Sequence, residues 1–291
     1  MFEYTEYNFA PWGTDLAIYF FLIGTAAMVF VFAAAPQVFG GAARALAPLQ
    51  LPATIVALAI TIVCVPLLIL DLGQAGRFLY PILYFRWTSP LSWGSVLLIL
   101  FALAMLVFGY GLYRSDAPWL RTVGVVGSLL ALSMPLYTGI DLMANQAREV
   151  WQSPLVPLLF VVLSVTSGAA VLTVLALVWK GATPDATVLL RRILLASVAI
   201  TLVMFFVEVV VLTFGTQEEQ TAWTLINSEF GTRFWLLTLL VGIVVPLVLL
   251  ALPALAGNPV LVSVAGIAGM VGAYTFREVI LYAGQLPQLY Y

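Results

Sequence analysis

The chain alternates between long apolar stretches and short polar connections. The eight apolar stretches are residues 15–38, 51–70, 91–112, 119–142, 155–179, 193–214, 234–255 and 260–283. A helix needs about 20 apolar residues to cross the hydrocarbon core of a bilayer. Lipid offers no hydrogen-bond partners, so such stretches form helices rather than open strands. The pattern therefore predicts an all-α integral membrane protein with eight transmembrane helices.

The connections between these stretches are short, and the longest are residues 71–90 and 215–233. We therefore expect one polytopic transmembrane domain over residues 1–291. Composition agrees with this interpretation, because 63% of the residues are hydrophobic and 8% are charged, whereas soluble domains average about 25% charged residues. A net charge of −2 argues against nucleic acid as a partner. Glu3 and Glu6 replace the basic start of a signal peptide, so cleavage is not expected.

Lysine and arginine are distributed unevenly between the two sides of the predicted bundle. Eight spans place both termini on the same side of the membrane. The opposite side carries Arg44, Arg114, Arg121, Lys180, Arg191 and Arg192, and the terminal side carries Arg77, Arg86, Arg148 and Arg233. Basic loops favour the cytoplasm. The bias predicts that both termini lie outside the cytoplasm.

One short pattern occurs twice. Residues 87–91 (WTSPL) open the third span and residues 151–155 (WQSPL) open the fifth. Upstream of each, a span ends in an aspartate followed by an arginine: Asp71 and Arg77, then Asp141 and Arg148. Serine before proline predicts a helix start, with the hydroxyl capping the first turn. The match in order favours an internally repeated helix-pair unit, although chance similarity of two helix starts is the alternative.

Ionisable residues inside the spans lie near the terminal side. They are Asp15, Asp71, Asp141, Glu208, Arg277 and Glu278. Charges in a membrane are costly and mark functional sites unless they are paired. Glu208 lies deepest, between apolar neighbours, and must be protonated or partnered, with Arg277 as a possible partner. A functional carboxylate and a structural buried ion pair are equally open for Glu208.

Neutral polar and aromatic groups join this layer. They are Tyr19, Tyr137, Asn145, Trp93, Trp12 and Tyr274. Tyr137 and Asp141 are four residues apart and share a helix face. Aromatic residues also form belts at membrane interfaces, which is the alternative for each of them.

The chain has no histidine and one cysteine, Cys64. Histidine is the usual axial ligand of haem in membrane bundles, and clusters need several thiolates. We therefore expect no haem, iron–sulfur, molybdenum or other metal site in this chain.

Three classes of function fit these features to different degrees. Acids, phenols and aromatic walls near one face suit a lipophilic quinone, whose headgroup needs hydrogen bonds and a proton route to water. A transporter of a small solute or ion is the second class, but transporters favour inverted repeats and a polar midplane, and this repeat is parallel. A purely structural membrane anchor is the third class, and it leaves Glu208 unexplained.

Three tracts resemble the NrfD/PsrC family, the membrane subunits of polysulfide reductase and related complexes. They are residues 71–78 (DLGQAGRF), residues 89–94 (SPLSWG) and residues 137–151, which include Tyr137, Asn145, Arg148 and Trp151. The tracts extend over roughly a third of the chain. The resemblance implies an NrfD/PsrC-like bundle that oxidises or reduces menaquinone or ubiquinone near the periplasmic face of the bacterial cytoplasmic membrane. It also implies two extrinsic partners: a ferredoxin-like iron–sulfur subunit and, through it, a molybdopterin catalytic subunit.

The resemblance also implies roles for individual residues. A tyrosine at the place of Tyr137 lies at the quinone headgroup in the family, and an acid at the place of Asp71 belongs to the nearby proton path. The family's first-helix histidine has no counterpart here; Tyr19 falls closest to its place, and Asp15 or Thr14 could serve instead.

The combined prediction assigns three groups of residues. The quinone-binding residues are Tyr137, Tyr19, Asp15, Asn145, Arg148 and Trp93. The proton-transfer residues are Asp71, Asp141 and Glu208, and the structural or ion-paired residues are Arg77, Arg277 and Glu278. The sequence does not set the direction of electron flow. The uncharged cytoplasmic half favours proton exchange outside without pumping, although Ser133, Thr166, Ser167 and Thr201 with ordered water could form an uncharged route.

Overall fold

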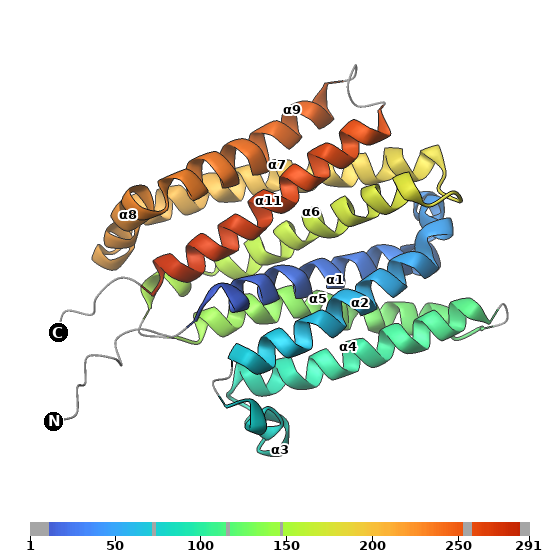
Figure 1. The fold of residues 1–291 in the computed structure, drawn as a ribbon, viewed down its shortest axis with the longest axis horizontal. Coiled ribbons are helices and arrows are strands. Elements are labelled where there is room, and N and C mark those ends of the chain that lie inside the picture. The colour runs from blue at the N-terminus through green and yellow to red at the C-terminus, as the bar shows by residue number, and fades with distance from the viewer. Residues whose placement is uncertain (1–11, 72–73, 115–116, 146–147, 253–257, 286–291) are drawn as a thin grey trace.

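The computed structural model describes residues 12–71, 74–114, 117–145, 148–252 and 258–285, which form helices and no strands. Eight helical segments in this part of the chain are long and apolar enough to cross a membrane (Figure 1). The first four are α1 (Thr14–Val38), η2 with α2 (Gly41–Leu49 and Gln50–Asp71), α4 (Pro90–Tyr113) and α5 (Leu120–Met143). The second four are α6 (Leu155–Val178), α7 (Pro184–Phe214), η5 with α9 (Thr232–Val244 and Val245–Ala251) and α11 (Pro259–Ala283). The predicted all-α bundle of eight spans is confirmed.

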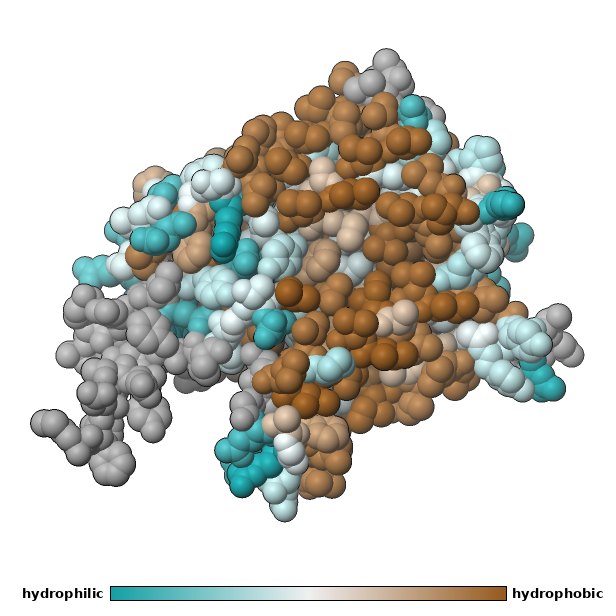
Figure 2. Space-filling view, viewed as in Figure 1, coloured by the Kyte–Doolittle hydropathy of each residue, from teal (hydrophilic) through white to brown (hydrophobic). Residues whose placement is uncertain are grey.

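Helix α1 lies at the centre of the bundle and packs against α2, α5, α6 and α11. In its most apolar stretch 78% of the residues are buried, against 28% in the span that contains α2. Figure 1 shows the spans running side by side, with the start of α1 and the end of α11 at the same end of the bundle. Hydrophobic residues cover the middle of the molecule in Figure 2, and the hydrophilic ones gather towards its two ends.

Helix α7 begins nine residues before the predicted start of the sixth span. The hydroxyl of Thr183 accepts a hydrogen bond from the Ala186 amide, and Pro184 occupies the first turn, where a missing N–H costs nothing. The guanidinium of Arg191 donates from Nε and Nη2 to the carbonyl oxygen of Leu250, at 3.1 and 2.7 Å. The polar start of the helix is therefore capped, and Arg191 lies on a helix rather than in a loop.

The seventh span differs from the prediction in winding and in length. Its first part, η5, is a π-helix, and the hydroxyl of Thr238 donates to the carbonyl of Arg233 five residues earlier. The continuation, α9, ends at Ala251, short of the predicted residue 255. Residues 253–257 lie outside the described residues.

Two predicted connections contain helices. The segment 71–90 includes η3 (Ala75–Arg77) and α3 (Tyr80–Leu83), and the segment 215–233 includes α8 (Gln217–Glu229). Helix α8 begins with a capping box: the Thr216 amide donates to Glu219 Oε2 at 2.6 Å, and the Glu219 amide donates to Thr216 Oγ1 at 3.3 Å. This threonine-x-x-glutamate spacing is a helix-start signal that was present in the sequence.

The repeated serine–proline motifs start two helices, but their serines act differently. Ser89 is the residue before α4, and its side chain makes no capping hydrogen bond. Ser153 lies two residues before the start of α6, and its hydroxyl accepts a hydrogen bond from the Leu155 amide at 3.3 Å. The expectation of two alike caps is therefore wrong for Ser89. The short helix η4 (Glu149–Trp151) lies just upstream of the second motif.

Candidate functional site

Two buried tyrosines lie within electrostatic range of each other near the terminal end of the bundle. Tyr19 of α1 is 1% exposed and Tyr137 of α5 is 7% exposed. The two phenols are close enough to interact electrostatically with each other, and both interact with Asp141. Cys64 of α2 is a further neighbour of Tyr19. The structure thus brings together three of the predicted site residues from two helices that are distant in sequence.

A glycine in α4 makes room for the Tyr137 ring. A Cβ atom at Gly94 would overlap the ring carbons of Tyr137. The phenol therefore lies directly on the α4 backbone, and any larger residue at position 94 would displace it.

An apolar cavity of about 170 Å³ lies between α2, α3 and α4. Its lining includes Val65, which is 40% exposed, and Ile99, which is 47% exposed, so it borders the lipid-facing surface. The cavity and the tyrosine pair both border α2 and α4, a region that we call the seam, although neither tyrosine is among the residues that line the cavity. Leu98, which lines the cavity, is one turn from Gly94, and Thr61 and Leu68 flank Cys64 on one face of α2.

Other predicted headgroup residues make structural contacts at helix ends. The Asn145 amide donates to the backbone oxygens of Asp141 and Leu142, at 3.0 and 3.3 Å, and so closes the end of α5. Arg148 is buried and donates from Nη1 to the carbonyl of Gln285 at 3.2 Å. The Trp93 indole donates to the carbonyl of Trp87 at 3.0 Å. These three residues shape the terminal end of the site through backbone contacts.

The predicted acids occupy different environments. Asp15 lies exposed in the first turn of α1. The side chain of Asp71 lies outside the described residues. Glu208 of α7 is 1% exposed, and neither carboxylate oxygen has a hydrogen-bond partner among the residues that the structure describes. Ser153 and Glu219 lie close enough to interact electrostatically with this carboxylate. Helix α6 packs against both α5 and α7, so Glu208 lies apart from the tyrosine pair.

The expected contact between Arg277 and Glu208 is not formed. Arg277 is fully buried, and its Nη1 donates to the carbonyl of Ala273 at 2.7 Å. Its Nη2 donates to the carbonyl of Phe160 and to the hydroxyl of Ser164, both at 2.8 Å. The guanidinium also lies over the Phe160 ring, 5.1 Å from its centroid. Neutral oxygens and an aromatic face therefore solvate this charge, and the prediction of a buried carboxylate partner is corrected.

The other two residues predicted as structural behave differently from each other. Glu278 pairs with Arg233 at 3.5 Å and accepts a hydrogen bond from the Tyr274 hydroxyl at 3.2 Å. Arg77 is exposed, and its guanidinium lies 5.6 Å from the centroid of the Tyr80 ring. Glu278 is thus ion-paired as predicted, and Arg77 makes a cation–π contact.

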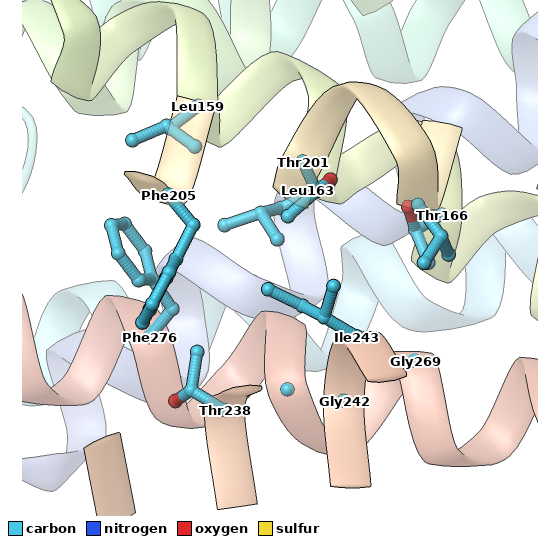
Figure 3. Close-up of a pocket in the computed structure, with 12 residues that line it drawn as sticks. Leu159, Leu163, Thr166, Thr201, Phe205, Thr238, Gly242, Ile243, Gly269 and Phe276 are labelled. Atoms are coloured by element: carbon cyan, nitrogen blue, oxygen red, sulfur yellow. The ribbon is translucent and has the colours of Figure 1, made fainter. Parts of the chain in front are cut away.

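A small cavity lies among α6, α7, η5 and α11, inside the second half of the bundle (Figure 3). Its volume is about 10 Å³, which is the room that about one water molecule needs. Thr166 donates to the hydroxyl of Ser197 at 2.9 Å, and Thr201 donates to the carbonyl of Ser197 at 2.8 Å. Both threonines belong to the predicted uncharged route. The cavity therefore has room for no more than about one water molecule beside these hydroxyls.

The sequence is similar to a known protein family and to several of its members. The model of the family described as "Polysulphide reductase, NrfD" matches residues 3–287. Protein NrfD of Escherichia coli strain K12 is 28% identical over 94% of this chain and 95% of its own length. The C chain of polysulfide reductase from Wolinella succinogenes is 23% identical over 96% of this sequence and 96% of its own. The C subunit of selenate reductase from Mesobacillus selenatarsenatis is 22% identical over 94% of this sequence and 74% of its own length.

Proposed function

This chain belongs to the NrfD family of polysulphide reductase proteins, and we propose that it is the membrane subunit of a respiratory oxidoreductase complex that exchanges electrons with a quinone. Two of its relatives are subunits of polysulfide reductase and selenate reductase. The observation that carries the proposal is that a buried tyrosine pair and an apolar cavity with a partly exposed lining both border α2 and α4.

The chemistry of the seam suits a quinone. Its headgroup needs donors for two carbonyl oxygens, and Tyr19 and Tyr137 supply two hydroxyls from two helices. Its tail is apolar, and the cavity between α2, α3 and α4 is lined almost wholly by apolar side chains. Binding sites for small molecules commonly combine apolar walls with a few placed polar groups.

The proposed reaction is the two-electron oxidation of a quinol or its reverse. A bound quinol loses two electrons to an extrinsic acceptor and two protons from its hydroxyl oxygens. Tyr137 and Tyr19 orient these oxygens, and Asp141, one helical turn from Tyr137, accepts a proton and passes it towards the terminal end of the bundle. Glu208, on α7, also stays a candidate for proton transfer. We keep Asp71, at the end of α2, as a further candidate for the proton path.

The electron partner and the membrane orientation are part of the same proposal. The chain has no histidine and one cysteine, so we propose that electrons pass to a docked iron–sulfur subunit and on to a molybdopterin catalytic subunit, without haem in this chain. The excess of basic residues opposite the termini supports placing both termini at the periplasmic face of the cytoplasmic membrane. Protons then exchange outside, without pumping by this chain.

The decisive experiment replaces Tyr137 with Phe in the complete complex. The ring still fills the space over Gly94, so the fold is kept, but the hydroxyl that orients the headgroup is lost. We expect quinol turnover to fall at least about tenfold, with the complex still assembling.

Tyr110→Phe is the matched control, because Tyr110 is exposed on α4 and stacks under Arg114 at the opposite end of that helix. Turnover should be unchanged in this variant. Equal turnover in Tyr137→Phe and the parent complex, at all quinol concentrations, would refute the placement of the headgroup.

A further inference from the structure

Two adjoining hollows lie at the end of the bundle opposite the termini. The first, of about 380 Å³, is lined by residues of the α1–η2 turn and by Arg121 of α5. The second, of about 680 Å³, is lined by residues of η2 and of the first turns of α7, including Arg192. Arg44 of η2 lines both hollows. Three arginines from three separate helices therefore surround two spaces that share one wall.

The backbone holds Arg44 at this shared wall. Gly40 and Gly41 have φ angles of 62° and 50°, a conformation that side-chain-bearing residues rarely adopt. This turn sends η2 back across the end of the bundle, and the Arg44 side chain packs over Gly40. In the first hollow, Gln50 donates to the carbonyl of Ala33 at 3.0 Å, which fixes the floor next to Arg44.

The charge of the hollows is positive. Three arginines and one carboxylate, Asp185, line them, so their net charge is three minus one, or two positive charges. No salt bridge joins Asp185 to these arginines among the described residues. The guanidinium groups are exposed at the bundle end, where they are accessible to an anion with oxygen acceptors.

Apolar side chains border the same hollows. Phe39, which is 75% exposed, lines the first hollow, and Val188, which is 45% exposed, lines the second. Apolar side chains do not stabilise a bound inorganic phosphate, whereas they can pack against the acyl chains of a lipid. Basic pockets between transmembrane helices are known as headgroup sites for anionic lipids.

We propose that the two hollows bind the phosphates of an anionic phospholipid, with one phosphate beside Arg44 and Arg121 and a second beside Arg44 and Arg192. A lipid with two phosphates, such as cardiolipin, fills both hollows with one molecule. Its acyl chains then lie along Phe39 and Val188 and enter the bilayer.

The test is a lipid titration of the purified full chain in detergent, followed by native mass spectrometry. The probes are cardiolipin, phosphatidylglycerol, phosphatidylcholine and inorganic phosphate. Cardiolipin should bind most tightly and phosphatidylcholine most weakly. Arg121→Gln and Arg192→Gln should each weaken cardiolipin binding about fivefold, and Arg44→Gln should weaken it more than either.

Arg114→Gln is the control, because Arg114 lies at the same end of the bundle but lines neither hollow, and its affinity should equal that of the parent. If Arg44→Gln does not fold, the Arg121 and Arg192 variants decide the matter. Equal affinities in the parent and these two variants would overturn the proposal. So would equal binding of cardiolipin and phosphatidylcholine, or displacement of cardiolipin by millimolar inorganic phosphate.

Discussion

The two tryptophan–serine–proline motifs have nearly the same sequence and opposite surroundings. Trp151 is 1% exposed; its indole donates to the carbonyl of Ile280 at 3.0 Å and stacks on Trp12 at 5.1 Å. Trp87 is 77% exposed, and its ring lies against those of Phe85 and Trp93, which are close to it in the sequence. The two similar sequences thus both precede a helix, but the tryptophan is a core residue in one and a surface residue in the other.

The two motifs also differ in how firmly their surroundings hold them. The second motif is clamped by α11 and by the residues before α1, so its helix pair cannot separate from the core. The first motif lies at the edge, next to the cavity between α2, α3 and α4. We infer that the same structural unit serves as a fixed support in one copy and borders the lipid-accessible seam in the other.

The largest expected effect comes from replacing each of the two tryptophans with alanine and comparing the losses of stability. Trp151→Ala should lower the free energy of unfolding by about 3–5 kcal/mol, because it leaves a large cavity and removes the indole hydrogen bond to the Ile280 carbonyl. Trp87→Ala should change it by no more than about 0.5 kcal/mol. Thermal unfolding of the purified variants in one detergent measures both. Equal losses of stability would mean that burial does not separate the two copies.

A second experiment compares two glycine substitutions in α4, one next to Tyr137 and one away from it. Gly94→Ala should displace the Tyr137 ring and lower quinol turnover about tenfold or more in the assembled complex. Gly109→Ala in the same helix is its control, since a Cβ there would make an ordinary contact of 3.6 Å with Thr54. Both changes raise helix propensity alike. Equal quinol turnover in the two variants would show that the position of the Tyr137 ring does not affect the reaction.

The smallest expected effect concerns the two serines. Ser153→Ala should destabilise the chain by about 1 kcal/mol, because the hydroxyl accepts a hydrogen bond from the Leu155 amide. Ser89→Ala should have less effect, since Ser89 makes no capping hydrogen bond. Denaturant unfolding of the two variants tests the difference. A larger loss of stability in Ser89→Ala than in Ser153→Ala would contradict the assignment of the capping hydrogen bond to Ser153.

The length of the apolar stretches was sufficient to predict the eight spans, because the thickness of the bilayer sets how many apolar residues a span needs. It failed at polar helix ends such as the start of α7, where Thr183 and Arg191 extend the helix beyond the apolar stretch. Helix α8 was missed for a different reason. Its signal, the capping box of Thr216 and Glu219, depends on spacing rather than on hydrophobicity.

The site was partly predictable. The spacing of Tyr137 and Asp141 placed them on one helix face, and the resemblance suggested Tyr19 as a neighbour. The partners of Arg277 were not predictable, because backbone carbonyl oxygens, such as that of Phe160, carry no mark in a sequence. Gly94 lay within a quoted motif, but its contact with the Tyr137 ring depends on how α4 and α5 pack together.

The central place of α1 has a consequence for how the protein is made. This helix is synthesised before its partner α11, which begins at Pro259, more than 200 residues later. Until the ribosome completes that last span, one side of α1 has no protein neighbour and must face lipid or an insertion chaperone. We therefore expect chains truncated before α11 to be the preferred targets of membrane proteases.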